Sequence, residues 1–97
     1  MAKGYWIARV RITDPERYKD YVAANAEAFR KYGAKFVVRG GQSETPSGPV
    51  HDRHVVLEFE SYATAKACYN SPEYLRAKAI RDEASEADVV IVEGFDG

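Results

Sequence analysis

The segment of this sequence with the most groups that could bind a ligand or take part in a reaction is a predicted helix interruption. It carries two phenols, an amide and a hydroxyl. It reads Tyr69-Asn70-Ser71-Pro72-Glu73-Tyr74. Ser71 followed by Pro72 is typical of a helix start, because the hydroxyl accepts from free N–H groups and proline suits the first helical position. Such a break suits a polar ligand at the mouth of an apolar cleft. Tyr69, Ser71 and Tyr74 are therefore candidate ligand-binding residues, although capping and packing would explain them equally well.

Arg39 and Trp6 are the other candidate ligand-binding residues. Arg39 ends a short predicted strand, 35–39, beside Gly40-Gly41. Its guanidinium could hold a carboxylate or an oxyanion, and a structural salt bridge is the competing interpretation. Trp6 lies on the first predicted strand, where a large aromatic side chain either lines the cleft or is part of the core.

The sequence does not assign a catalytic group, and the two candidates for one are His54 and Arg39. Histidine can accept a proton near neutral pH, and arginine can hold a developing anion. Cys68 has no histidine in the same helical turn, which argues against a nucleophilic role. His51 and His54 flank Asp52-Arg53, but no further histidine or cysteine cluster exists, so no metal site is predicted.

Hydrophobic periodicity predicts the element order β-α-β-β-α-β. Strands are expected at 4–12, 35–39, 54–60 and 87–93, and helices at 15–32, 62–69 and 72–84. With right-handed crossovers this order gives an α+β fold of ferredoxin-like type, a four-stranded antiparallel sheet with its helices on one face. Leu75 and Ala79 are expected to form the core stripe of the last helix, with Arg81 more exposed.

Both faces of the predicted sheet carry apolar residues, and the helices can cover only one. In the first strand one parity gives Trp6, Ala8, Val10 and Ile12, while the other gives Tyr5, Ile7, Arg9 and Arg11. The uncovered face also holds His54, Val56 and apolar residues of the last strand. Burying one such side chain stabilises the protein by roughly 1.5–3 kcal/mol relative to leaving it in water. We therefore expect a homodimer formed through the open sheet face.

Composition narrows the classes of partner. The 97 residues form one expected domain, 1–97, with a formal net charge of -1, so no basic field attracts nucleic acid. RNA-recognition modules share this element order but need stacking aromatics on the central strands, where this chain has Val56, Glu58 and Glu60. There is no long apolar run and no charged leader before an apolar stretch, so no membrane association is predicted. With a single cysteine, a cytoplasmic location is the expectation.

Several short motifs together resemble a bacterial family catalogued as domain of unknown function 1330. They are Gly4-Tyr5-Trp6, Asp14-Pro15, Tyr18 with Tyr21, Arg39-Gly40-Gly41, Phe59 before Ser61, and the Tyr69–Tyr74 segment. The resemblance covers essentially the whole chain and implies a dimeric α+β barrel, in which two ferredoxin-like sheets pack face to face. Related branches include cofactor-free quinone-forming monooxygenases and haem-degrading monooxygenases, which commonly use the cleft between a sheet and its own helices. Residues 61–85 contain no histidine for haem iron, so no cofactor is expected.

The functional hypothesis is a homodimer that binds or transforms a small aromatic or carbonyl compound without a cofactor, in a sheet–helix cleft. The alternative is a non-catalytic ligand-binding or assembly module. The loop at 42–50 is longer than most hairpin connections, and it could lie over its own cleft or over that of a second copy.

Overall fold

The computed structural model describes residues 2–96, and its elements follow the predicted order. They are β1 (Gly4–Ile12), α1 (Pro15–Ala24), α2 (Ala26–Tyr32), β2 (Lys35–Arg39), β3 (Arg53–Phe59), α3 (Tyr62–Tyr69), α4 (Pro72–Ala84) and β4 (Ser85–Glu93). The helix expected at 15–32 is divided at Asn25, which keeps helical backbone angles. The second helical region is divided at Asn70 and Ser71, as the sequence predicts.

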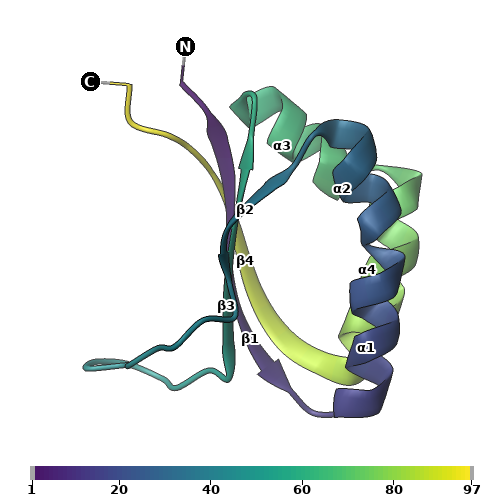
Figure 1. The fold of residues 1–97 in the computed structure, drawn as a ribbon, viewed down its shortest axis with the longest axis vertical. Coiled ribbons are helices and arrows are strands. Elements are labelled where there is room, and N and C mark those ends of the chain that lie inside the picture. The colour runs from purple at the N-terminus through teal and green to yellow at the C-terminus, as the bar shows by residue number, and fades with distance from the viewer. Residues whose placement is uncertain (1, 97) are drawn as a thin grey trace.

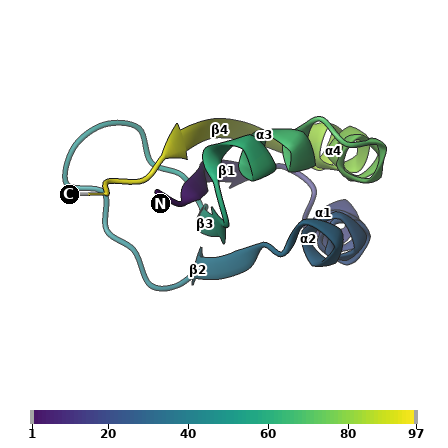
Figure 2. The same cartoon turned by 90° about the horizontal axis from the view of Figure 1, so that it is seen from above.

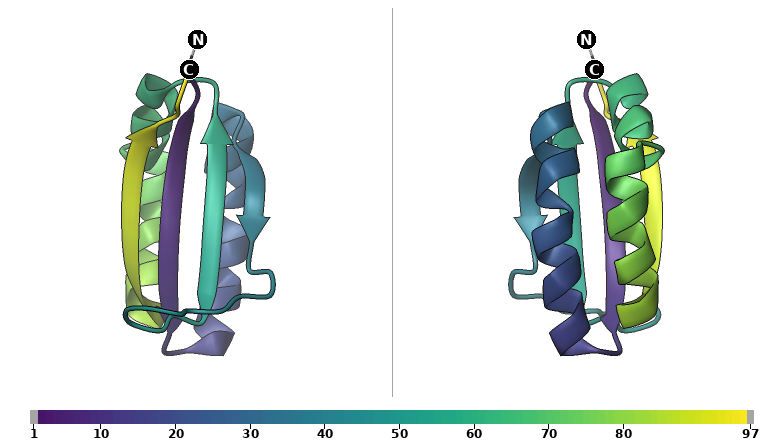
Figure 3. Two further views of the ribbon diagram at one scale, coloured as in Figure 1. Left: turned by 90° about the vertical axis from the view of Figure 1, so that its left-hand side faces the viewer. Right: turned by 90° about the vertical axis from the view of Figure 1, so that its right-hand side faces the viewer.

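The four strands form one antiparallel sheet in the order β2-β3-β1-β4. All four helices lie on one side of this sheet, as Figures 1 and 2 show. The ferredoxin-like α+β fold predicted from the sequence is therefore confirmed. The arrangement places α1 and α4 side by side across the helix-side face of the sheet (Figure 3, right).

Capping residues fix where several of the helices begin and end. Asp14 accepts a hydrogen bond from the backbone N–H of Arg17, and Ser61 accepts from that of Thr64 at 3.1 Å. At the other end of the first helical region Gly33 has a φ of 69°, the left-handed conformation that glycine adopts without strain. These caps set which residues of each helix turn toward the sheet.

Trp6 is the centre of the aromatic core. Only 3% of its surface is exposed, and its ring meets those of Phe29, Tyr69 and Tyr74 edge-on at 5.4, 5.2 and 4.8 Å between centroids. Its indole N–H donates to the Ala65 carbonyl at 2.8 Å, so its polar atom is satisfied by the fold. The helix-side parity of β1 therefore meets the helices as predicted.

The buried stripe of α4 differs from the prediction. The residues that face the sheet are Tyr74, Ala77, Arg81 and Ala84, whereas Leu75 is 47% exposed and Ala79 is also exposed. Arg81, predicted to be more exposed, is only 6% exposed. The prediction was wrong because it ranked residues by apolar character. The Arg81 guanidinium donates to buried tyrosines, as described below. Arg81 can therefore be buried in the same stripe as Tyr74.

Within residues 2–96, the opposite face of the sheet carries no helix (Figure 3, left). Ile7 and Val90 there are 44% and 55% exposed. The loop between β2 and β3 crosses one end of this face, where Asp52 accepts from the Ile12 N–H at 2.8 Å and Arg11 donates to the Val50 carbonyl at 3.3 Å. In a single protomer, this loop therefore lies on the side of the sheet away from the helices.

Candidate ligand-binding site

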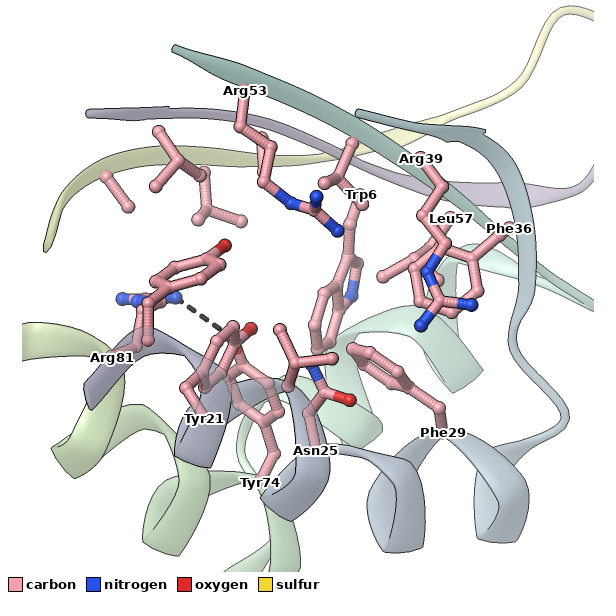
Figure 4. Close-up of a pocket in the computed structure, with 17 residues that line it drawn as sticks. Trp6, Tyr21, Asn25, Phe29, Phe36, Arg39, Arg53, Leu57, Tyr74 and Arg81 are labelled. Atoms are coloured by element: carbon pink, nitrogen blue, oxygen red, sulfur yellow. Dashed lines mark hydrogen bonds between the residues drawn. The ribbon is translucent and has the colours of Figure 1, made fainter. Parts of the chain in front are cut away.

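A narrow cavity lies between the helix-side face of the sheet and helices α1, α2 and α4 (Figure 4). The space open to the centre of a water molecule is about 30 Å³, and the empty space reaches about 500 Å³ only when the opening to solvent is included. Its walls are mostly apolar and aromatic. None of the lining residues is Asp or Glu, while three are arginines. The lining residues are Trp6, Ala8, Val10, Tyr18, Tyr21, Val22, Asn25, Phe29, Phe36, Arg39, Arg53, Val55, Leu57, Tyr74, Arg81, Ala87 and Val89.

Tyr21, Tyr74 and Arg81 form a buried hydrogen-bonded group that we call the tyrosine end of the cavity. The two hydroxyl oxygens are 2.7 Å apart, and Arg81 Nη1 donates to the Tyr74 oxygen at 3.0 Å. Tyr74 and Arg81 lie seven residues apart on α4, which puts them on one helix face, and Tyr21 reaches them from α1. The group joins the two helices beneath the sheet.

Burial keeps both tyrosines of this group protonated. Desolvation raises the pKa of Tyr74, and it raises the pKa of Tyr21 as well, although the hydrogen bond from Tyr74 works in the opposite direction there. Burial alone would lower the pKa of Arg81, but the surrounding tyrosine oxygens, Tyr74 foremost, raise it. The tyrosine end therefore presents neutral hydroxyls beside a permanent positive charge.

Arg39 reaches the cavity because β2 contains an irregularity. Phe36 pairs with Leu57 and Arg39 pairs with Val55, so that Val37 is an extra residue in the ladder. Strict alternation would put Phe36 and Arg39 on opposite faces of the sheet. The bulge places both on the helix side, where the Arg39 guanidinium lies 4.2 Å from the centroid of the Phe36 ring.

Arg53, the first residue of β3, lies on the same face two residues before Val55, the partner of Arg39. Residues in this diagonal relation across two strands are about 7–8 Å apart. Arg53 extends from the sheet toward the helices, with its guanidinium 5.9 Å from the centroid of the Tyr18 ring (Figure 4). Arg39 and Arg53 together form what we call the arginine rim.

Gly40 makes room for Arg53. Its φ is 63°, and a Cβ built on it would lie 2.6 Å from Arg53 Nη1. Its N–H donates to the His54 carbonyl at 2.8 Å, which closes the β2–β3 ladder at this end. The backbone angle therefore favours glycine here, and the missing side chain leaves space for the guanidinium without a shift of Arg53.

The helix break brings only one of its three candidate residues to the cavity. Tyr74 lines it, whereas Ser71 donates to the Cys68 carbonyl at 2.7 Å and accepts from the Tyr74 N–H at 3.2 Å. Both bonds of the Ser71 hydroxyl thus serve the helix start. Tyr69 is not a lining residue but accepts from Arg81 Nη2 at 3.2 Å, so it supports the tyrosine end from behind.

Of the remaining candidates, Trp6 and Arg39 line the cavity and His54 does not. His54 pairs with Arg9 and alternates with Arg53 and Val55 along β3, so it lies on the open face of the sheet. The candidate base His54 is therefore placed on the face of the sheet opposite to the cavity. A side chain on that face cannot reach a ligand held between the sheet and the helices.

Sequence reasoning gave no ligand-binding role to four polar residues that line the cavity: Tyr18, Tyr21, Arg53 and Arg81. A signal for Arg81 was present, because Tyr74 and Arg81 share a helix face at a spacing of seven. Arg53 shares its parity with Val55, Leu57 and Phe59, the apolar side of β3, which packs into the core. A charged residue at the end of an otherwise apolar parity could have been read as a cavity residue.

The chain belongs to the family described as Domain of unknown function (DUF1330), whose model matches residues 3–95. No curated protein matches the chain. Among residues 2–96, no helix has the combined length and apolar character needed to cross a bilayer.

Solved structures similar to this chain share its fold at low sequence identity. A protein of unknown function from Rhodopseudomonas palustris is 19% identical with a TM-score of 0.78, and the match covers 99% of this chain and 85% of that one. SnoaB, a cofactor-independent oxygenase from Streptomyces nogalater, is 13% identical with a TM-score of 0.66, covering 100% and 97%. A dimeric ferredoxin-like protein of unknown function from Thermobifida fusca is 19% identical with a TM-score of 0.62, covering 95% and 89%.

Proposed function

We propose that this protein binds a small anion with an aromatic or otherwise apolar body in the cavity between its sheet and its helices. The observation that carries the proposal is the charge of the lining, which has three arginines and neither Asp nor Glu. Among residues 2–96, Arg39 and Arg53 have no carboxylate within salt-bridge distance. Cationic side chains around an apolar cavity without counter-charges complement a ligand that supplies the negative charge.

Thermal denaturation with a panel of aromatic and carbonyl acids tests this proposal. A ligand present at about 100 times its Kd stabilises the folded state by roughly 2.7 kcal/mol. For a domain of this size that corresponds to a rise in Tm of roughly 10 °C or more. We expect Arg39→Ala to lose most of this shift, while Arg30→Ala, which alters an exposed arginine outside the cavity, should retain it.

Two results would contradict the proposal. One is a panel in which no anion stabilises the wild-type protein. The other is an Arg39→Ala variant whose response matches that of the wild type, because the ligand would then bind elsewhere.

Cofactor-independent catalysis is a second candidate, and the tyrosine end favours it. Hydroxyl donors beside the Arg81 charge would stabilise an oxyanion that develops on an aromatic or carbonyl substrate. The structural likeness to SnoaB, a cofactor-independent oxygenase, makes oxygen uptake the first reaction to measure. We expect hydroquinones to consume oxygen faster with the protein than without it, and Tyr21→Phe to slow this reaction. Equal rates with and without protein would favour the non-catalytic binding alternative.

The protein is further proposed to act as a homodimer whose open sheet faces pack together. Ile7, Val90 and Val92 are exposed on that face, and the similar Thermobifida fusca protein is dimeric. Sedimentation should give a dimer at micromolar concentration for the wild type and a monomer for Val90→Glu. Leu75→Glu is the matched control, since Leu75 is similarly exposed on the outer side of α4. A wild-type monomer, or dissociation by both variants, would contradict this interface.

A further inference from the structure

The tyrosine end has an unused hydrogen-bond donor. Arg81 Nη1 donates to Tyr74, and Nη2 donates to Tyr69 and to Asp82, the latter at 3.3 Å. Its Nε is buried and has no hydrogen-bond partner among residues 2–96, although the residue is 94% buried and lines the cavity. A buried N–H of a charged group without an acceptor is costly, so a ligand oxygen would complete this site.

The two hydroxyls beside Arg81 supply a second donor. The Tyr74 oxygen accepts from Arg81, so Tyr74 can direct its own proton to the Tyr21 oxygen, 2.7 Å away. The O–H of Tyr21 then points away from Tyr74 and can donate to a ligand, in competition with the neighbouring side chain of Asn25. A chain that begins at a guanidinium and ends at a hydroxyl is polarised toward an acceptor that carries negative charge.

The charge balance at the tyrosine end also favours an anion. Asp82 is the one carboxylate in contact with Arg81 among residues 2–96, and its side chain is 53% exposed. Asp82 also accepts from Lys78 at 2.8 Å, so it is shared between two cations. The other groups that surround the Arg81–Tyr74 pair are the Tyr18 and Tyr21 phenols of α1, the Tyr69 phenol of α3 and the Arg53 guanidinium of β3. None of these groups supplies negative charge.

The arginine rim is a second and separate site for an anion. Arg39 stacks on Phe36, and Arg53 is placed over the left-handed Gly40. Phe36 is 38% exposed, so this end of the cavity lies near the protein surface. Two guanidiniums on neighbouring strands match the planar geometry of a carboxylate, which can accept two hydrogen bonds from each.

Flat aromatic walls connect the two sites. Trp6 and Phe29 line the cavity and meet edge-on at 5.4 Å, and Phe29 meets Phe36 in the same way at 5.7 Å. Figure 4 shows Trp6 and Phe29 between Arg39 on one side and Tyr21 and Tyr74 on the other, with Phe36 beside Arg39. Such walls suit an aromatic ring, because stacked and edge-on arrangements of rings are favourable.

From the tyrosine end, the arginine rim and the aromatic walls between them, we propose that the ligand is an aromatic hydroxy-acid. Its carboxylate binds at the arginine rim, and its hydroxyl binds at the tyrosine end as the phenolate, after releasing its proton to solvent. This inference rests on the proposed function and deepens it, because it names the ligand class and gives each end of the cavity its own role.

Matched sets of probes test the inference. One set is 6-hydroxy-2-naphthoate, 2-naphthoate and 2-naphthol, and the single-ring set is 4-hydroxybenzoate, benzoate and phenol. Calorimetry should show the hydroxy-acid of at least one set binding ten-fold or more tightly than either of its partners. The absorbance of the bound naphthol group should show ionisation at a pH at least one unit lower than for the free probe.

Variants separate the two ends. Tyr21→Phe keeps the ring and removes the hydroxyl, so it should weaken 2-naphthol and the hydroxy-acid but not 2-naphthoate, and it should reverse the shift in ionisation. Arg39→Gln should weaken the two carboxylates but not 2-naphthol, and should leave the ionisation unchanged. Arg30→Gln, on the exposed side of α2, is the control and should alter neither. Tyr74→Phe provides a second variant of the tyrosine end if Tyr21→Phe does not fold.

The outcomes distinguish this inference from the proposed function. If no probe of either set binds, the proposed function fails and this inference with it. If in neither set the hydroxy-acid binds more tightly than the matching carboxylic acid, or if the bound hydroxyl ionises as it does in water, the cavity binds anions but the phenolate site is wrong. An ionisation shift that survives both Tyr21→Phe and Tyr74→Phe would also overturn it.

Discussion

The arginines on the two faces of the sheet differ in whether a carboxylate pairs with them. On the open face, Arg9 lies 3.4 Å from Asp88 and Arg11 lies 3.3 Å from Glu86, both on the neighbouring strand β4. On the helix side, Arg39 and Arg53 have no such partner among residues 2–96, and the lining of the cavity contains no carboxylate. The open face is thus balanced in charge and apolar between its ion pairs, as a self-complementary interface needs. The helix side keeps unbalanced positive charge next to apolar walls.

The largest expected effect is on the free energy of unfolding, and it should differ between two neighbouring residues of β1, Trp6 and Ile7. Trp6 is buried on the helix side and Ile7 is exposed on the open face. Trp6→Ala should lower the free energy of unfolding by about 3–5 kcal/mol, because it removes the centre of the aromatic core. Ile7→Ala should cost a monomer much less and act mainly by weakening the dimer. Urea denaturation at several protein concentrations measures both, and similar concentration-independent losses would contradict the difference between the faces.

A second comparison sets a cavity arginine against an open-face arginine. Arg53→Gln should reduce affinity for aromatic acids about ten-fold or more, since a charged hydrogen bond is worth about 1.5–3 kcal/mol. Arg9→Gln should leave this affinity unchanged, because Arg9 faces the other side and is paired with Asp88. Equal losses from the two substitutions would mean that overall charge, and not the cavity, attracts the ligand.

The pH dependence of stability tests whether the Cys68 thiol on α3 is shielded from solvent in the folded protein. Burial raises the pKa of the Cys68 thiol to about 12. Between about pH 9 and pH 12 the unfolded thiol loses its proton while the native thiol keeps it, so stability should fall as the pH rises. The slope is about 1.4 kcal/mol per pH unit. Urea denaturation at pH 8 and pH 10 gives the free energy of unfolding of the wild type and of Cys68→Ala, and the wild type should lose more of it between the two pH values. Equal losses would show that the thiol is not shielded.

The smallest expected effect concerns two adjacent glycines. Gly40→Ala should cost roughly 1 kcal/mol, because of its positive φ, and should weaken aromatic-acid binding a few-fold by displacing Arg53. Gly41→Ala is the matched control, since a Cβ there meets nothing within 4 Å and its φ is ordinary. If both variants bind alike, the position of Arg53 does not depend on Gly40.

Much of the fold was predictable because it depends on local signals. The bounds of β1 and β2, the caps at Asp14, Ser61 and Ser71, and the glycine at the end of α2 all follow from residue type and spacing. The all-apolar parity of β1, which begins at Trp6, also predicted which side of the sheet meets the helices.

The site was less predictable because it depends on how distant elements meet. The position of Arg39 follows from a bulge that alternation cannot show, and the burial of Arg81 follows from tyrosines on α1, α3 and α4. Residue type alone made Ser71 and His54 attractive, yet one serves a helix cap and the other lies on the far face.

The extra residue in β2 has a consequence for comparing this chain with its relatives. Because Val37 is the residue without a partner, a related chain that lacks it could form a regular edge strand and still deliver an arginine over its phenylalanine. Sequence alignments across this strand should therefore allow a one-position gap at Val37. Matching residues by simple count would pair the arginine with a residue on the wrong side and hide a shared function.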